Sequence, residues 1–171
     1  MSTTIQRDAQ SGVGKWVVTG AMRGILAGIL FLAFEMLVAG IMGPSPFGPP
    51  RMIGATVLGQ GALPMPQPPN VGLATVVPVA LVVHFVLSAI YGAVFGAIAS
   101  AIGVLCRSRG LLVVAASVFG LVLWLVNFYV VAPVLFPWFL MANPVVQFLA
   151  HTFFFGTALG LLLASRVGDE E

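Results

Sequence analysis

Residues 75–105 read TVVPVALVVHFVLSAIYGAVFGAIASAIGVL, an apolar run in which His84 is the only group that titrates near neutral pH. About 20 helical residues cross the ~30 Å hydrocarbon core of a bilayer, so this run is long enough for one membrane span. Three other long apolar runs occur along the chain. The sequence therefore predicts an all-α integral membrane protein with four transmembrane helices, at about residues 16–42, 73–104, 111–136 and 144–165.

The composition leads to the same class of protein. Hydrophobic residues make up 60% of the 171 residues, and charged residues only 7%. A soluble domain needs more charge to cover its surface, so we expect one membrane domain over residues 1–171 in contact with the lipid bilayer. No basic cluster with interleaved aromatic residues occurs, which argues against nucleic acid as a partner. The single cysteine, Cys106, cannot form an internal disulfide.

The distribution of lysine and arginine predicts the orientation. Six of these residues precede the first span, enter its first turns, join the second span to the third, or follow the fourth: Arg7, Lys15, Arg23, Arg107, Arg109 and Arg166. Only Arg51 falls on the other side. We therefore predict two tandem hairpins with both termini in the cytoplasm. The Ala-, Val- and Gly-rich composition is typical of a bacterial inner-membrane protein. The N-terminal MSTTIQRDAQSGVGK lacks the features of a signal peptide, so the first span is expected to be retained.

The longest connection, residues 43–72, is expected on the outer side and contains most of the prolines. Its two ends, GPSPFGPP and ALPMPQPPN, are expected to be extended, because proline disfavours a continuous helix. The sequence between them, RMIGATVLGQGA, could form a short helix on the bilayer surface. This segment is expected to be a packed outer cap or, alternatively, a lid over a site below it.

The two halves of the chain resemble each other, which suggests an internal duplication. Aligning GILFLAFEMLVAG (28–40) with GLVLWLVNFYVVA (120–132) pairs Glu35 with Asn127. In the second helix of each hairpin, YGAVFGAIAS resembles FGTALGLLLAS, but this alignment leaves the two histidines three residues out of register. Both hairpins are expected to run in the same direction, so the repeats would be parallel.

Small residues at four-residue spacing predict where the helices pack closely, as they do in other membrane helices. Such glycines occur on all four predicted spans: Gly20, Gly24, Gly28, Gly92, Gly96, Gly120, Gly156 and Gly160. These seams could join helices within one chain or between chains, so self-association stays open.

The only polar groups that stand out within the spans are Glu35, His84, Asn127 and His151, one from each helix. At 1.5 Å per residue, each lies roughly 12–15 Å below the outer boundary of the membrane. On a helical wheel, Glu35 and Asn127 share a face with packing glycines. Ionisable residues at this depth are costly and are functional-site candidates by default. The sequence therefore predicts a polar cluster inside the bundle.

Two kinds of ligand site are compatible with this cluster. His84 and His151 could be the axial ligands of haem b, with Glu35 and Asn127 orienting them and Arg51 meeting a propionate. Alternatively, Glu35, His84 and His151 could form a site for a metal ion, a proton or a small ligand, since one carboxylate and two imidazoles suit Zn, Fe or Cu.

The favoured prediction is a non-enzymatic accessory or assembly subunit of a larger membrane complex. In this case the polar cluster fixes the register of the helices, as many buried polar groups in membranes do. The motifs HExxH, GxSxG, CxxC and the P-loop do not occur, and no second acidic residue accompanies Glu35 within the spans. This absence disfavours an enzyme.

Overall fold

The computed structural model describes residues 2–64 and 68–167, with side chains from residue 12 onward, and every regular element in these ranges is a helix. The acidic C-terminal residues and residues 65–67 of the segment ALPMPQPPN lie outside the described residues. Four helices are long and apolar enough to cross a membrane, which confirms the prediction of an all-α membrane protein in contact with lipid. They cover Gly12–Met42, Leu73–Ala101, Arg109–Leu135 and Pro144–Ala164.

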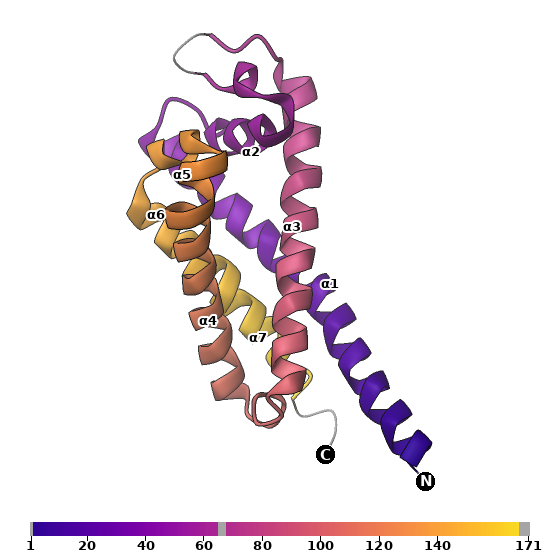
Figure 1. Ribbon diagram of the computed structural model, residues 1–171. Coiled ribbons are helices and arrows are strands. Elements are labelled where there is room, and N and C mark those ends of the chain that lie inside the picture. Colours follow the sequence, from indigo (N-terminus) through magenta and orange to yellow (C-terminus); the bar gives the residue numbers. More distant parts are fainter. Residues whose placement is uncertain (1, 65–67, 168–171) are drawn as a thin grey trace.

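The first hairpin consists of α1 (Ser2–Met42) and α3 (Leu73–Ala101), which cross near their middles (Figure 1). At the crossing, glycine lets the two backbones touch: a Cβ atom on Gly24 would lie 2.9 Å from the Cα of Gly92. Gly20 and Gly28 lie one turn to either side and face Gly92 and Ser88. Close backbone contact of this kind is how membrane helices gain van der Waals energy without a hydrophobic driving force.

The predicted second span extends further at its C-terminal end than the observed helix does. It was expected to reach Val104, but α3 ends at Ala101, because Ile102 leaves the helical region with φ −100° and ψ 77°. Gly103 follows, and the short 3₁₀ turn η2 (Leu105–Arg107) then leads into the second hairpin.

The second hairpin is built from interrupted helices. Its two arms are α4 (Arg109–Val126), η3 (Asn127–Val131) and α5 (Ala132–Leu135), followed after η4 (Pro137–Met141) by α6 (Pro144–Leu149), η5 (Ala150–Thr157) and α7 (Ala158–Ala164). Segments η3 and η5 are π-helical. The side chain of Asn143 caps α6 by accepting from the N–H groups of Val145 and Val146 (2.9 and 3.3 Å).

Glycine also forms the seam of the second hairpin. A Cβ atom on Gly120 would lie 2.9 Å from the Cα of Gly156, and one on Gly160 would lie 2.8 Å from the Cα of Val113. Helix α1 packs against η5 and α7 as well as against α3, so it joins the two hairpins. At the end of the bundle that carries the chain termini, Arg166 donates to the backbone oxygen of Lys15 and to the Thr19 hydroxyl (3.1 and 2.6 Å).

The opposite end of the bundle is covered by α2 (Gly48–Leu58), which lies across it (Figure 1), and by the 3₁₀ turn η1 (Gln60–Ala62). A short helix was predicted here, but it begins inside the segment GPSPFGPP, which was expected to be extended. The physical reason is that Pro49 and Pro50 occupy the first turn of α2, where a missing N–H breaks no helical hydrogen bond.

Three hydrogen bonds from the side chains of Arg51 and Trp138 to backbone oxygens hold the cap in place. Arg51 donates to the carbonyl oxygens of Ala62 and Val71 (2.9 and 3.2 Å). The indole N–H of Trp138 donates to Met52 O at 3.0 Å, which ties α2 to the second hairpin. The cap is therefore packed against both hairpins.

Candidate functional site

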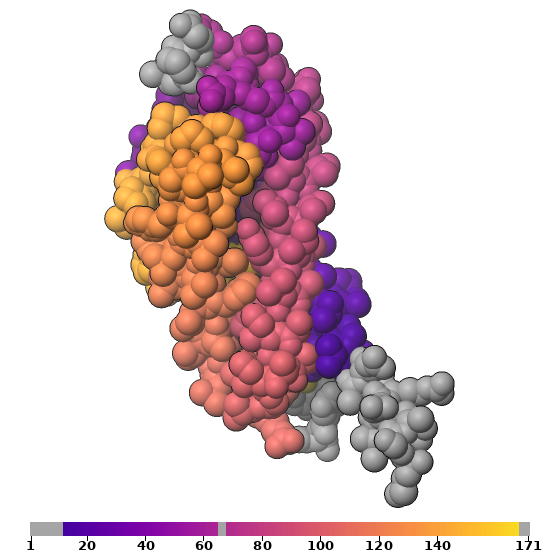
Figure 2. All heavy atoms as spheres, viewed as in Figure 1, coloured from indigo at the N-terminus to yellow at the C-terminus, as the bar shows by residue number. Residues whose placement is uncertain are grey.

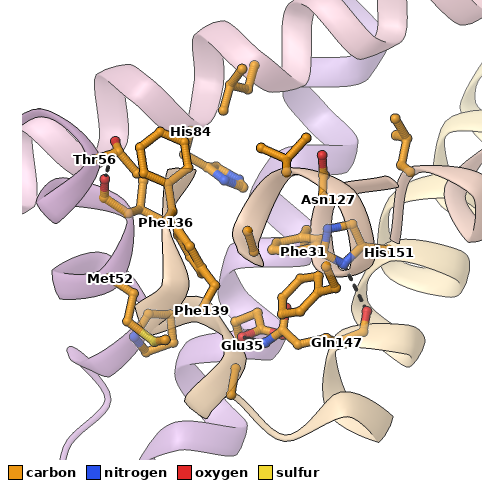
Figure 3. Close-up of a pocket in the computed structure, with 18 of the residues that line it drawn as sticks. Phe31, Glu35, Met52, Thr56, His84, Asn127, Phe136, Phe139, Gln147 and His151 are labelled. Atoms are coloured by element: carbon orange, nitrogen blue, oxygen red, sulfur yellow. Dashed lines mark hydrogen bonds between the residues drawn. The ribbon is translucent and has the colours of Figure 1, made fainter. Parts of the chain in front are cut away.

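A cavity of about 270 Å³ lies between the two hairpins, below α2 (Figure 3). Helix α1 contributes Phe31 and Glu35, and the cap contributes Pro49, Met52, Ile53 and Thr56. All four predicted polar residues line it, together with four others; the full polar set is Glu35, Thr56, His84, Ser88, Tyr91, Asn127, Gln147 and His151. The rest of the lining is apolar and contains five phenylalanines, so the cavity is a mostly apolar space with a few polar groups. That is the usual make-up of a small-molecule site.

Glu35 and Gln147 form a pair between α1 and α6. The amide nitrogen of Gln147 donates to both carboxyl oxygens of Glu35, at 3.0 and 2.8 Å. Only 6% of the Glu35 residue is exposed. A polar group removed from water in this way needs a hydrogen-bond partner, and Gln147 supplies it across the hairpin boundary.

His84 is held by the first hairpin. Its Nε2 lies 2.8 Å from the carbonyl oxygen of Gly28 on α1. Gly28 permits this contact because a Cβ atom there would lie only 3.3 Å from the same ring nitrogen and would also collide with the Ser88 side chain. The glycine seam therefore sets the position of the imidazole.

His151 lies in the π-helical segment η5, and its Nδ1 lies 2.8 Å from the carbonyl oxygen of Gln147, four residues earlier in the same arm. Figure 3 shows the ring above Gln147, with Asn127 nearby. Like His84, the His151 residue is 9% exposed. Asn127 begins the other π segment, η3, and its Oδ1 accepts from the Tyr91 hydroxyl at 3.3 Å, which links the second hairpin to α3.

The Phe31 ring contacts both imidazoles. Its centroid lies 5.4 Å from that of His84 and 4.9 Å from that of His151. In this arrangement the Phe31 ring packs against both imidazoles, and the Nε2 atom of His84 is already engaged by the carbonyl oxygen of Gly28. Arg51, which was expected near a haem propionate, instead bonds to the cap backbone and is not among the residues that line the cavity.

The predicted metal ligands share the cavity without converging on one point. Among residues 2–64 and 68–167, no three His, Cys, Asp or Glu side chains form a group that could hold a metal ion. Glu35 accepts from Gln147, and each histidine donates to a backbone carbonyl oxygen in a different part of the chain, His84 to Gly28 and His151 to Gln147. The observed arrangement is thus better suited to hydrogen bonding than to metal ligation.

Gln147 and Phe31 are two site residues that the predicted set omitted, as it omitted the polar lining residues Thr56, Ser88 and Tyr91. Gln147 lies four residues before His151 and so shares its helical face, which was a usable signal. Phe31 lies four residues before Glu35 on α1, but a phenylalanine in an apolar run carries no signal of a site.

The cavity reaches the side of the molecule. Figure 2 shows the surface recessed between α3 and the α4–α5 arm, beneath the cap. Leu87 on α3 lines the cavity, and 41% of this residue is also exposed at the surface. Leu87 lies in the middle of a span, where the surroundings are lipid.

No protein-family model matches the sequence, and no curated protein or solved structure is similar enough to match it. The geometry of the cavity therefore carries the functional argument.

Proposed function

We propose that the protein binds a small, largely apolar molecule in the cavity between its two membrane hairpins. The observation that carries this proposal is the shared location of Glu35, His84, Asn127, Gln147 and His151, which come from four different helices and line one cavity. If these residues served only to fix the register of the helices, we would expect them to contact one another and to fill the space between the helices. Here they surround a space of about 270 Å³ instead.

The membrane in this proposal is the bacterial inner membrane, with both termini in the cytoplasm and the cap on the outer side, as the distribution of Lys and Arg predicts. The cap then lies between the cavity and the outer aqueous phase, and its residues Met52 and Thr56 form part of the cavity wall. An accessory or assembly role stays a prediction, as does haem b.

The test is to purify the protein in mild detergent and to analyse what remains bound. An organic extract is examined by mass spectrometry, and the same sample gives a reduced-minus-oxidised absorption spectrum and a metal analysis. We expect an apolar compound close to a 1:1 ratio. A sharp haem band lost on His151→Ala, or a stoichiometric metal, would contradict the proposal and favour one of the other two ligand hypotheses.

A matched pair of variants on α3 localises the binding. Val83 lines the cavity, whereas its neighbour Val82 is 64% exposed and faces away from it. Val83→Phe should fill part of the cavity and remove the bound compound, and Val82→Phe should retain it. Equal amounts of compound in the two variants would show that it binds elsewhere.

A further inference from the structure

The hydrogen bonds of the two histidines fix which ring nitrogen carries the proton in the neutral imidazole. A backbone carbonyl oxygen can only accept, so Nε2 of His84 donates to Gly28 O and Nδ1 of His151 donates to Gln147 O. The remaining nitrogens, Nδ1 of His84 and Nε2 of His151, are therefore acceptors. Among the described residues, neither of these two nitrogens has a donor within hydrogen-bond distance.

None of the other described polar groups in the cavity donates to either free imidazole nitrogen, and this includes the Asn127 amide and the Ser88 hydroxyl, which also line the cavity. The amide N–H groups of Gln147 are directed to Glu35, and the hydroxyls of Tyr91 and Thr56 donate to Asn127 Oδ1 and Ile53 O. No lysine or arginine lines the cavity. A ligand that satisfies the imidazoles must consequently bring its own hydrogen-bond donor.

His151 is the better placed of the two acceptors. Its Nδ1 faces back along its own helical arm to Gln147, so the opposite edge of the ring, with Nε2, is directed away from that arm. The rings of Phe31 and Phe128 contact the imidazole edge-on, with centroids 4.9 and 5.7 Å away. An aromatic ligand would find suitable stacking partners beside this nitrogen.

The recessed surface beside the cavity indicates the source of the ligand. The surface is recessed between α3 and the second hairpin, beneath α2 (Figure 2), and Leu87 of α3 both lines the cavity and is exposed. A charged ligand would have to be stripped of water to reach this depth, which is costly. A neutral molecule dissolved in the bilayer has no such barrier.

We propose that the cavity takes a neutral, lipid-soluble ring compound with a hydroxyl group, such as a phenol or hydroquinone, that enters from the bilayer beside Leu87 and donates to Nε2 of His151. This inference rests on the proposed ligand-binding function and specifies the chemical class of the ligand. It requires no electron or group transfer.

The test compares two probes of similar shape, 1-naphthol and 1-methoxynaphthalene, which differ by the hydroxyl donor. Binding to the full chain in lipid nanodiscs is measured by calorimetry, and binding to empty nanodiscs is subtracted. One neutral hydrogen bond to a buried acceptor corresponds to roughly tenfold in affinity. We expect 1-naphthol to bind about tenfold more tightly than its methyl ether.

Variants of His151 assign the acceptor. His151→Leu should abolish the preference for 1-naphthol over 1-methoxynaphthalene. His151→Gln, which keeps an acceptor, should restore part of the preference. Thr152→Val is the matched control, because Thr152 adjoins His151 but does not line the cavity, and it should retain the full preference.

Each other outcome overturns a stated part of the inference. Equal affinities of the wild-type protein for the two probes would overturn the donor requirement but would leave ligand binding intact. A preference that persists in His151→Leu would overturn the assignment of His151. Failure of both probes to bind wild-type protein that shows a cooperative unfolding transition would overturn the proposed function itself.

Discussion

The two hairpins pack through the same kind of glycine contact but differ in the regularity of their helices. In the first hairpin, a Cβ atom on Gly24 would face the carbonyl oxygen of Ser88 and lie 3.2 Å from the nitrogen of Gly92. In the second, a Cβ atom on Gly120 would face the carbonyl oxygen of His151 and lie 3.1 Å from the nitrogen of Gly156. Ser88 precedes its glycine by four residues and His151 by five, so the second seam contains one additional residue.

The additional residue belongs to the π-helical segment η5 and changes which side chains face the cavity. Relative to the seam, His151 takes the position of Ser88, and Gln147 takes the position of His84. The histidines are consequently not equivalent in the two hairpins, although both line the cavity. Single π turns within α-helices are frequent at functional sites, which agrees with the position of η3 and η5 beside the cavity.

The two π segments have different local causes. In η3, the ring of Pro133 would clash with the carbonyl of Tyr129 in a continuous α-helix, and the wider turn separates these groups. In η5 there is no proline. There the Thr157 hydroxyl lies 3.2 Å from the carbonyl oxygen of Thr152, five residues earlier, and 2.7 Å from the Ser117 hydroxyl on α4. This polar contact connects the π turn to the facing helix.

The largest effect is expected from filling the seams. Gly92→Leu places a side chain against the backbone of Gly20 and Gly24, and Gly156→Leu does so against Ala116 and Gly120. Because backbone cannot move aside as a side chain can, each variant should lose about 3 kcal/mol or more of unfolding free energy. Thermal unfolding in detergent measures the loss.

Gly110→Leu serves as the control for these variants, since a Cβ atom there meets nothing within 4 Å. It should unfold close to the wild-type temperature. A Gly156→Leu protein as stable as the wild type would contradict the similarity of the two glycine seams. It would mean that the π segment rearranges to accept the side chain.

The second-largest effect is expected at the pair that joins the hairpins. Gln147→Leu leaves the buried Glu35 carboxyl without the donor seen in the structure, which should cost about 1–3 kcal/mol. The double variant Glu35→Leu/Gln147→Leu should recover part of this loss, because no unsatisfied group remains. Thermal unfolding of the two single variants and the double variant gives the coupling free energy.

Gln60→Leu, at an exposed position in the cap, is the matched control and should change the unfolding temperature little. Strictly additive losses in the double variant would contradict a direct interaction between Glu35 and Gln147 in the membrane.

Much of this architecture could be predicted from the sequence, because membrane spans depend on composition and length alone. The four apolar helices, the short helix of the cap and four polar residues of the cavity, Glu35, His84, Asn127 and His151, follow from local patterns. The π segments could not be predicted, since they depend on contacts between helices, such as that of Ser117 with Thr157. The partner of Glu35 was missed for the same reason: the alignment of the two halves pairs it with Asn127, but the chain packing brings it to Gln147.

The predicted duplication stays a prediction for a related reason. In the seam contacts, Gly24 of the first hairpin occupies the position equivalent to Gly120 of the second. The sequence alignment instead makes Gly28 equivalent to Gly120. These two registers differ by one helical turn, a shift that keeps the same helix face and that sequence periodicity alone therefore distinguishes poorly.

A smaller effect is expected from the hydroxyl beside η5. Thr157→Val keeps the shape of the side chain but removes the contacts with Ser117 and Thr152, which should cost about 1 kcal/mol. Amide hydrogen exchange should become faster in residues 150–157 and stay unchanged in α1 and α3. The exposed Thr75→Val is the control. Unchanged exchange in η5 would show that the π turn does not depend on this hydroxyl.

The smallest effect is expected at the contact between α3 and η3. Tyr91→Phe removes a hydrogen bond of 3.3 Å to Asn127, and a bond of this length should contribute only about 0.5 kcal/mol to unfolding. Tyr129→Phe is the matched control, because Tyr129 is 61% exposed on the same π segment and should give no change. A loss well above 1 kcal/mol in Tyr91→Phe alone would mean that this contact holds the two hairpins together. The hairpins would then depend on each other at the cavity as well as through α1.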